Sequence, residues 1–280
     1  MAEQQSPGSL IVTFFGAHGR ELTPDGRVPI AALVRLLGDV GVDAPAVRSA
    51  VSRLKRRGLL TVHRSGSRES GYAPSEAARQ LLEDGDRRIY QHTRHDGQWL
   101  LAVFSVPESE RSRRHVLRSR LARLGFGNAA PGVWVAPAHL EAETRHALER
   151  LELSAYVVLF RGVHAGFEPT SEAVARWWDL DALAELHRAF LTVHEPVLAS
   201  WARRRGTPEE EAYRDHLLAL DAWRRLPYAD PGLPAALLPG DWPGARSARV
   251  FTALHERLAP AASRFAAARL DEVRRRSLEA

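Results

Sequence analysis

Apolar side chains recur at helical spacing in three segments near the start of the chain. Ser9–His18 is rich in bulky apolar residues and is predicted to be a helix, and Pro29–Gly38 repeats them at intervals of three and four. A third, narrower stripe lies between Asp43 and Gly58 and consists of Val47, Val51 and Leu54. The pattern therefore predicts three consecutive helices that bury one face each.

Start and stop residues define the third helix. Asp43 can cap its N-terminus because the carboxylate accepts hydrogen bonds from backbone N–H groups that lack a helical partner. Pro45 is tolerated in the first turn, and Gly58 stands where helices commonly end in the left-handed conformation. The face left over carries hydroxyl and guanidinium groups and no acid: Arg48, Ser49, Ser52, Arg53 and Arg56. That face suits a recognition helix in a DNA groove, although cations in the last turn also complement the helix dipole.

A short hairpin is predicted directly after this helix. Leu59–His63 alternates as a strand, 64–68 is a polar tip, and 71–73 can return as the partner strand. Between Ala44 and Arg68 the chain holds seven Lys and Arg residues and no Asp or Glu. Three helices followed by a basic hairpin predict a winged helix-turn-helix, with Arg64 and Arg68 on the wing as further DNA contacts.

The hydrophobic pattern changes after residue 98. Trp99–Val106, a short segment near Phe126, Val133–Val135 and Ser154–Phe160 are strand candidates, separated by helices at 108–124 and 138–151. This β-α-β-β-α-β order predicts a ferredoxin-like domain. Helices are then expected at 170–205, 207–225 and 245–258, with a frayed end at 274–280.

The expected fold class is therefore α+β, in three domains. They are a winged helix-turn-helix at 1–74, a ferredoxin-like middle domain at 98–165 and a helical C-terminal domain at 166–280. A linking helix and connector fill 75–97.

Composition narrows the class of function. The 280 residues include no Cys, which excludes disulfides, thiolate metal sites and a cysteine nucleophile, and the formal net charge of +5 favours a polyanionic partner. Of 39 basic residues only Lys55 is lysine, so part of the arginine content reflects a general compositional bias. No apolar run approaches the roughly 20 residues of a membrane span and no signal peptide is evident, so we expect a cytoplasmic protein without membrane contact.

Several motifs outside the basic helix resemble one known family. They include Phe104–Glu108, Gly125–Gly127, Pro131–Trp134, Arg176–Asp179 and Asp230–Gly244. Together with Arg48 to Leu54 they are similar, in this order, to the PaaX family of bacterial repressors of phenylacetate-type catabolism. The resemblance covers the chain from about Ser9 to Leu258.

This resemblance implies a homodimeric repressor of a catabolic operon, with no catalysis and no cofactor, that binds double-stranded operator DNA. In type members of the family the aryl-CoA thioester phenylacetyl-CoA releases the DNA. An acyl-CoA or aromatic acid derivative is therefore the expected effector. The sequence contains no feature that fixes its identity.

Two groups of side chains are candidates for contact with such an effector. Arg114 and Arg118 could bind the phosphates of a CoA-type ligand, since guanidinium groups hold phosphates in a bidentate fashion. Trp134, Trp177 and Trp178 could line an aryl pocket. The same arginines could instead form a solvated helix face, and the tryptophans could be core.

Other functions fit the sequence less well. A metal-dependent nuclease using the ferredoxin-like domain would have Glu108 as a lone carboxylate, which is a poor Mg²⁺ site, and no histidine pair predicts a metal. Gly125–Ala130 matches a loose dinucleotide fingerprint but follows a helix, where a turn is expected. A ligand-sensing module whose winged helix binds protein is the remaining alternative.

Overall fold

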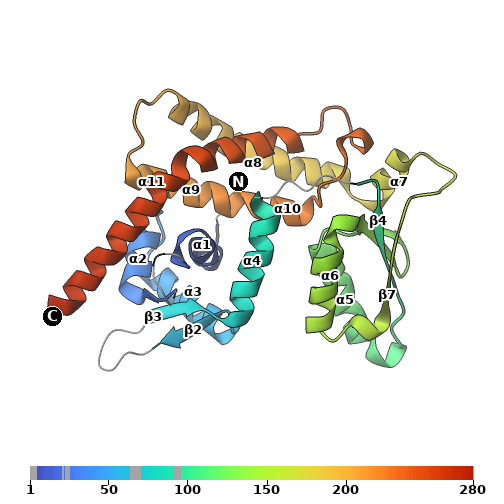
Figure 1. Ribbon diagram of the computed structural model, residues 1–280, viewed down its shortest axis with the longest axis horizontal. Helices are drawn as coiled ribbons and strands as arrows, with labels where there is room; N and C mark the ends of the chain where they lie inside the picture. Colours follow the sequence, from blue (N-terminus) through green and yellow to red (C-terminus); the bar gives the residue numbers. More distant parts are fainter. Residues whose placement is uncertain (1–4, 21, 23–25, 64–70, 91–95, 280) are drawn as a thin grey trace. The chain divides into compact units, whose positions relative to one another are not determined.

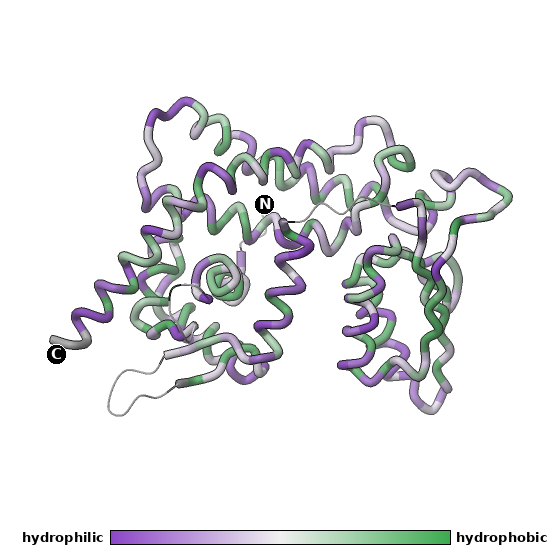
Figure 2. The backbone as a smooth tube through the Cα atoms, in the orientation of Figure 1, coloured by the Kyte–Doolittle hydropathy of each residue, from purple (hydrophilic) through white to green (hydrophobic). Residues whose placement is uncertain are grey.

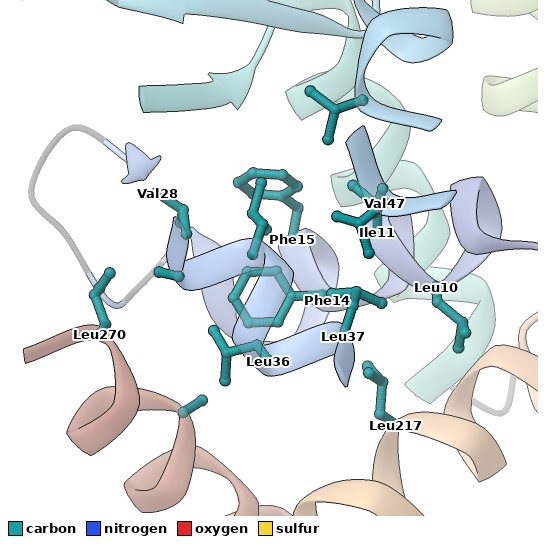
Figure 3. Close-up of a cluster of buried hydrophobic side chains, with 14 of the residues drawn as sticks. Leu10, Ile11, Phe14, Phe15, Val28, Leu36, Leu37, Val47, Leu217 and Leu270 are labelled. Carbon is teal, nitrogen blue, oxygen red and sulfur yellow. The ribbon is translucent and has the colours of Figure 1, made fainter. Parts of the chain in front are cut away.

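Three short helices open the chain where the apolar spacing predicts them. α1 (Pro7–Phe14) continues into a π-helical turn, η1 (Phe15–Gly19), and is followed by α2 (Ile30–Gly38) and α3 (Ala44–Arg56). Together they enclose a buried apolar cluster that includes Phe14, Phe15, Leu36, Leu37 and Val47 (Figure 3). The computed structural model describes residues 5–20, 22, 26–63, 71–90 and 96–279.

A small antiparallel sheet follows these helices. Its strands are β1 (Val28–Pro29), β2 (Leu60–His63) and β3 (Gly71–Pro74), in the order β1-β3-β2. The predicted hairpin is confirmed, because β2 and β3 pair from Leu60↔Pro74 to His63↔Gly71. β1 was not predicted, since two residues show no alternation.

A second, four-stranded antiparallel sheet lies further along the chain, after α4 (Glu76–Tyr90). Its strands are β4 (Trp99–Phe104), β5 (Gly127–Ala130), β6 (Val133–Pro137) and β7 (Val157–Gly162), in the order β5-β6-β4-β7. α5 (Arg111–Arg123) and α6 (Glu141–Arg150) connect strands in the predicted order and lie on the same face of this sheet (Figure 1).

Alternation along the strands divides the apolar side chains between the two faces of this sheet. Leu100, Ala102 and Trp134 belong to one buried cluster with Leu117 and Leu121 of α5. On the opposite face, a different cluster contains the neighbouring strand residues Trp99 and Val135, together with Val174 and Trp178. Part of each face is therefore core, but only the first is covered by α5 and α6.

The expectation of one helix over 170–205 is wrong. α7 (Thr170–Trp177) ends at Trp178, whose backbone is extended, and α8 (Leu180–Ala202) begins after it. The indole of Trp178 is buried and donates to the carbonyl oxygen of Gly125 at 3.0 Å. Asp179 then caps α8 by accepting from the backbone N–H of Ala182 at 3.0 Å.

The remaining helices are α9 (Glu209–Trp223), the short α10 (Leu226–Ala229) and α11 (Gly244–Glu279). α11 continues through Pro260 to Glu279, so the expected end at 258 and the frayed segment at 274–280 are not observed up to residue 279. Buried alanine and leucine side chains along α11 explain its continuation: Ala262, Ala266 and Leu270 pack in the same cluster as α1–α3.

The contacts divide the chain into two units with mixed helix and sheet. Unit 1 comprises residues 1–87, 189–224 and 246–280, and unit 2 comprises 88–188 and 225–245. The three domains inferred from the sequence stay a prediction. Within the described ranges, no helix is long and apolar enough to cross a membrane.

Candidate nucleic-acid interface

The basic helix α3 begins as its sequence predicts. Asp43 has an extended backbone, and its side chain accepts from the backbone N–H of Ala46 at 2.7 Å. This contact satisfies one of the N–H groups that the first turn leaves without a helical partner. Pro45 lies in that first turn, where it removes no helical hydrogen bond.

The C-terminus of α3 ends in a Schellman motif. Gly58 has φ +71° and its N–H donates to the carbonyl of Lys55 at 2.9 Å, while the N–H of Leu59 donates to the carbonyl of Leu54 at 3.0 Å. The two hydrogen bonds are those of a helix closed by a left-handed residue. Both ends of α3 are thus fixed by local contacts, which holds the position of the residues between them.

One face of α3 is buried and the other is fully available to solvent. Val47, Ala50, Val51 and Leu54 form the buried stripe, with exposed fractions of 5% or less. All five residues of α3 predicted to contact DNA are exposed: Arg48, Ser49, Ser52, Arg53 and Arg56. The structure therefore brings the predicted residues together on a single surface.

The cations on this surface have no acidic partner. Across the residues with a described structure, none of Arg48, Arg53 and Arg56 takes part in an ion pair. The guanidinium of Arg53 donates to Ser49 Oγ at 2.7 Å, one helical turn away. The positive charge of α3 is consequently available to an external anion.

Two further cations on the same helix end were not among the predicted contacts. Lys55 and Arg57 are also exposed on α3 and at its C-cap. Their signal was present in the basic run itself, but we had assigned that end of the helix to phosphate or dipole compensation. Arg64 and Arg68, the predicted wing contacts, lie outside the described residues.

α1 connects this helix to the C-terminal part of unit 1. A buried carboxylate, Asp221 of α9, accepts from Ser9 Oγ at 2.6 Å and from Thr13 Oγ1 at 2.7 Å. Arg224 donates to the same Thr13 hydroxyl at 2.7 Å. Since α1 and α3 share one apolar core, these bonds tie the basic helix to α9.

Three histidines that are remote in sequence also meet in unit 1. The ring nitrogens His216 Nε2 and His255 Nδ1 lie 3.0 Å apart, and the rings of His18 and His216 lie 5.7 Å apart. His18 Nδ1 lies 3.3 Å from Ser263 Oγ. Burial lowers the pKa of His18 to about 4 and that of His216 to about 3, with neighbouring histidine charge as the smaller cause. Their dispersion in sequence gave no signal of this cluster.

The arginines of α5 in unit 2 are largely used in local contacts. Arg114 donates to the carbonyl of Val106 at 2.8 Å and pairs with Glu108 at 3.1 Å. Arg113 pairs with Glu110 and donates to the carbonyl of Glu152 at 3.2 Å. Arg118 is exposed. Of the predicted phosphate ligands, Arg118 is therefore the more available one.

The tryptophans predicted to line a pocket do not all meet. Trp177 and Trp178 both contact Trp99, with ring centroids 5.7 and 6.0 Å apart. Trp134 belongs to the cluster under α5 and α6, on the other face of the sheet. Trp177 also contacts the ring of His164 at 5.2 Å, edge to face. Only Trp177 and Trp178 can contribute to one common site.

The glycine-rich segment after α5 serves packing. Gly125 has φ +90°, and a Cβ on Gly127 would lie 2.8 Å from the indole of Trp178. These glycines form the expected turn and allow Trp178 to approach the backbone closely. In the part of the chain that the structure describes, no group of three or more His, Cys, Asp or Glu side chains is arranged to hold a metal ion.

Comparisons with known proteins cover almost the whole chain. The family model described as PaaX-like protein matches residues 6–78, the PaaX protein central Cas2-like domain matches 92–174, and the PaaX-like protein C-terminal domain matches 178–268. The Transcriptional repressor PaaX of Escherichia coli (strain K12) is 28% identical over 247 residues, which are 86% of this chain and 77% of that protein.

A solved structure has the same fold. It is the uncharacterized protein Rv0674 from Mycobacterium tuberculosis, with a TM-score of 0.56 and 22% sequence identity, over 92% of this chain and 97% of that chain. Three family models in consecutive order and a full-length likeness agree with the motifs found in the sequence. The chain belongs to the PaaX family.

Proposed function

We propose that this protein is a transcriptional repressor that binds operator DNA through α3. The observation that carries the proposal is the exposed, acid-free face of α3, whose cations lack ion-pair partners among the described residues. Unpaired guanidinium groups on a rigidly capped helix are suited to phosphates and to guanine edges. The Escherichia coli relative is named a transcriptional repressor, which favours the same role here.

In this proposal residues 1–74 form a winged helix-turn-helix. α1, α2 and α3 precede the β2–β3 hairpin in the order that such a domain requires, and α3 is the recognition helix. Arg48, Ser49, Ser52 and Arg53 lie toward the front and middle of α3 and are assigned to bases. Arg56 lies in the last turn and is assigned to phosphate, as are Arg64 and Arg68 of the wing.

The middle of the chain is proposed to be a ferredoxin-like domain. Its order β4-α5-β5-β6-α6-β7 and the strand order β5-β6-β4-β7 support this assignment. We assign to the protein a small effector, an acyl-CoA or aromatic acid derivative such as phenylacetyl-CoA, with Arg114, Arg118, Trp134, Trp177 and Trp178 as its predicted contacts. Trp177 and Trp178 are the strongest of these because they share one cluster.

Release would follow from linkage. A homodimer reads two half-sites whose centres lie about 34 Å apart along the DNA. An effector that binds more tightly to an arrangement in which the two α3 helices no longer match this spacing lowers the affinity for the operator.

The test of DNA binding is a mobility-shift titration on the promoter region of the protein's own gene. We expect Arg48→Ala and Arg53→Ala each to weaken binding by roughly 1–3 kcal/mol if the side chain reaches a base. Arg246→Ala is the matched control, because Arg246 is exposed in unit 1 but paired with Glu195 at 2.6 Å. Unchanged affinity in both α3 variants would place the contact surface elsewhere.

Two additions to that titration separate the alternatives. Affinity that falls steeply between 50 and 200 mM salt, by about 10³-fold or more for six phosphate contacts, distinguishes DNA binding from a protein-binding role. A panel of CoA thioesters, with free CoA as control, tests the effector. If no thioester or free aromatic acid shifts the titration, the proposed effector class is wrong while DNA binding stands.

A further inference from the structure

Part of the four-stranded sheet in unit 2 carries apolar side chains that face solvent. Figure 1 shows α5 and α6 on one face of this sheet, and Figure 2 shows hydrophobic residues along β4 and β7. Val158 and Phe160 of β7 are exposed at 56% and 55%. Side chains of this type are normally buried, so their exposure in neighbouring alternate positions requires an explanation.

The strand register shows which other side chains lie beside them. Phe160 pairs with Leu101, and Val158 pairs with Val103 of β4. Val103 pairs in turn with Val133 of β6. Because paired residues point to the same face, these five residues form one continuous surface, which we call the open sheet face: Leu101, Val103, Val133, Val158 and Phe160. All five are partly or fully exposed.

The cover of this face stops short of these residues. At one end of the strands, Trp99 and Val135 are buried against Trp178 and Val174, with Leu101 at the border of that cluster. Beyond this border the exposure rises to the values of Val158 and Phe160.

β7 is also the outermost strand of the sheet. Edge strands are usually protected by proline, bulges or unpaired charges. β7 has regular pairing over Val157–Gly162, and its single charged residue, Arg161, is paired with Asp96 at 2.5 Å. Within the described residues no strand pairs with its outer side.

The size and charge of the open sheet face suit a self-contact. An aromatic side chain buries about 150–250 Å² and a contiguous apolar patch of a few hundred Å² is typical of an interaction site. Two such patches with a polar rim of similar area reach the roughly 1,000 Å² that a specific interface needs. In a chain with net charge +5, a face made of five uncharged residues can meet its own copy without repulsion.

We propose that the open sheet face is the surface on which a second copy of this chain docks, with Val158 and Phe160 of each copy packed across a twofold axis. This inference rests on the homodimer of the proposed function and not on DNA binding. A twofold contact uses the same patch on both copies, which requires only that the patch be complementary to itself.

The first test is sedimentation velocity of the full chain without DNA over a range of concentrations. We expect the wild type to be dimeric at micromolar concentration and Phe160→Glu to raise the dimer Kd by about 100-fold or more, because two carboxylates would be buried without partners. Val116→Glu is the control, since Val116 is 45% exposed on α5. It should leave the Kd unchanged, and circular dichroism should show both variants folded.

The second test uses the absence of cysteine from the chain. A short bis-maleimide should cross-link Val158→Cys into a covalent dimer, and should leave Val116→Cys monomeric. A monomeric wild type would contradict both the dimer and this surface. A dimer that survives Phe160→Glu, or that cross-links equally through Val116→Cys, would contradict the surface alone, and the mobility-shift titration decides DNA binding separately.

Discussion

At the scale of single residues, the buried histidines of unit 1 link stability to pH. His18 and His216 are almost fully buried, and burial lowers the pKa of each far below the ordinary value of about 6.5. The unfolded chain therefore binds more protons than the folded chain as the pH falls from 6.5 toward 4. Folding stability is fully present above pH 6.5 and is lost progressively below it.

His18→Gln should reduce this dependence. With a folded pKa of about 4, His18 alone accounts for roughly 2 kcal/mol of stability lost between pH 7 and pH 5. Denaturant unfolding at pH 7, 6 and 5 measures the slope, and His115→Gln, at an exposed position on α5, is the control. Equal slopes in wild type and His18→Gln would show that His18 is not the group being protonated.

At the scale of elements, α3 depends on its caps. The carboxylate of Asp43 accepts a hydrogen bond from the first turn at 2.7 Å. Asp43→Ala should lower the free energy of unfolding by about 1 kcal/mol, whereas Asp43→Asn, which can still accept the bond, should cost much less. Denaturant unfolding of the three proteins measures both. An equal loss in both variants would assign the effect to charge and not to the hydrogen bond.

The elements that could be predicted are those with a complete local signal. α3 was predicted with both ends because the cap, the stripe and the closing glycine all lie within Asp43–Gly58. The β2–β3 pairing was predicted from alternation and turn residues. The exposed face of α3 followed from the same spacing, since a buried stripe determines which residues remain outside.

The elements that could not be predicted depend on distant contacts. The break at Trp178 follows from an indole bond to Gly125, more than fifty residues earlier. The regular stripe of Ala262, Ala266 and Leu270 predicts an apolar face, but no sequence pattern says that its partner is the core of α1–α3. The same limit applies to His18, His216 and His255, whose positions in the sequence give no periodicity.

At the scale of the whole molecule, unit 1 is built from three separate stretches of chain. Leu217 of α9 and Leu270 of α11 lie in one buried cluster with the first helices (Figure 3). The DNA-binding part proposed here therefore has no complete core of its own. Its stability depends on helices that the chain reaches only near its end.

Leu270→Ala tests this dependence. Leu270 is 1% exposed, so its truncation should lower the free energy of unfolding by about 2–5 kcal/mol. Leu81→Ala is the control, because Leu81 of α4 is 37% exposed in the same unit. Operator affinity should fall as the folded fraction falls, although residue 270 is far from α3 in sequence. A loss no larger than that of Leu81→Ala would separate α11 from the folding of α1–α3.

The discontinuous construction of unit 1 also matters during synthesis on the ribosome. Residues 1–87 leave the exit tunnel long before residues 246–280 have been translated. The basic helix therefore emerges early, while the side chains that complete its core arrive last. A nascent or prematurely terminated chain should not occupy the operator, so repression begins only when translation of the whole polypeptide has finished.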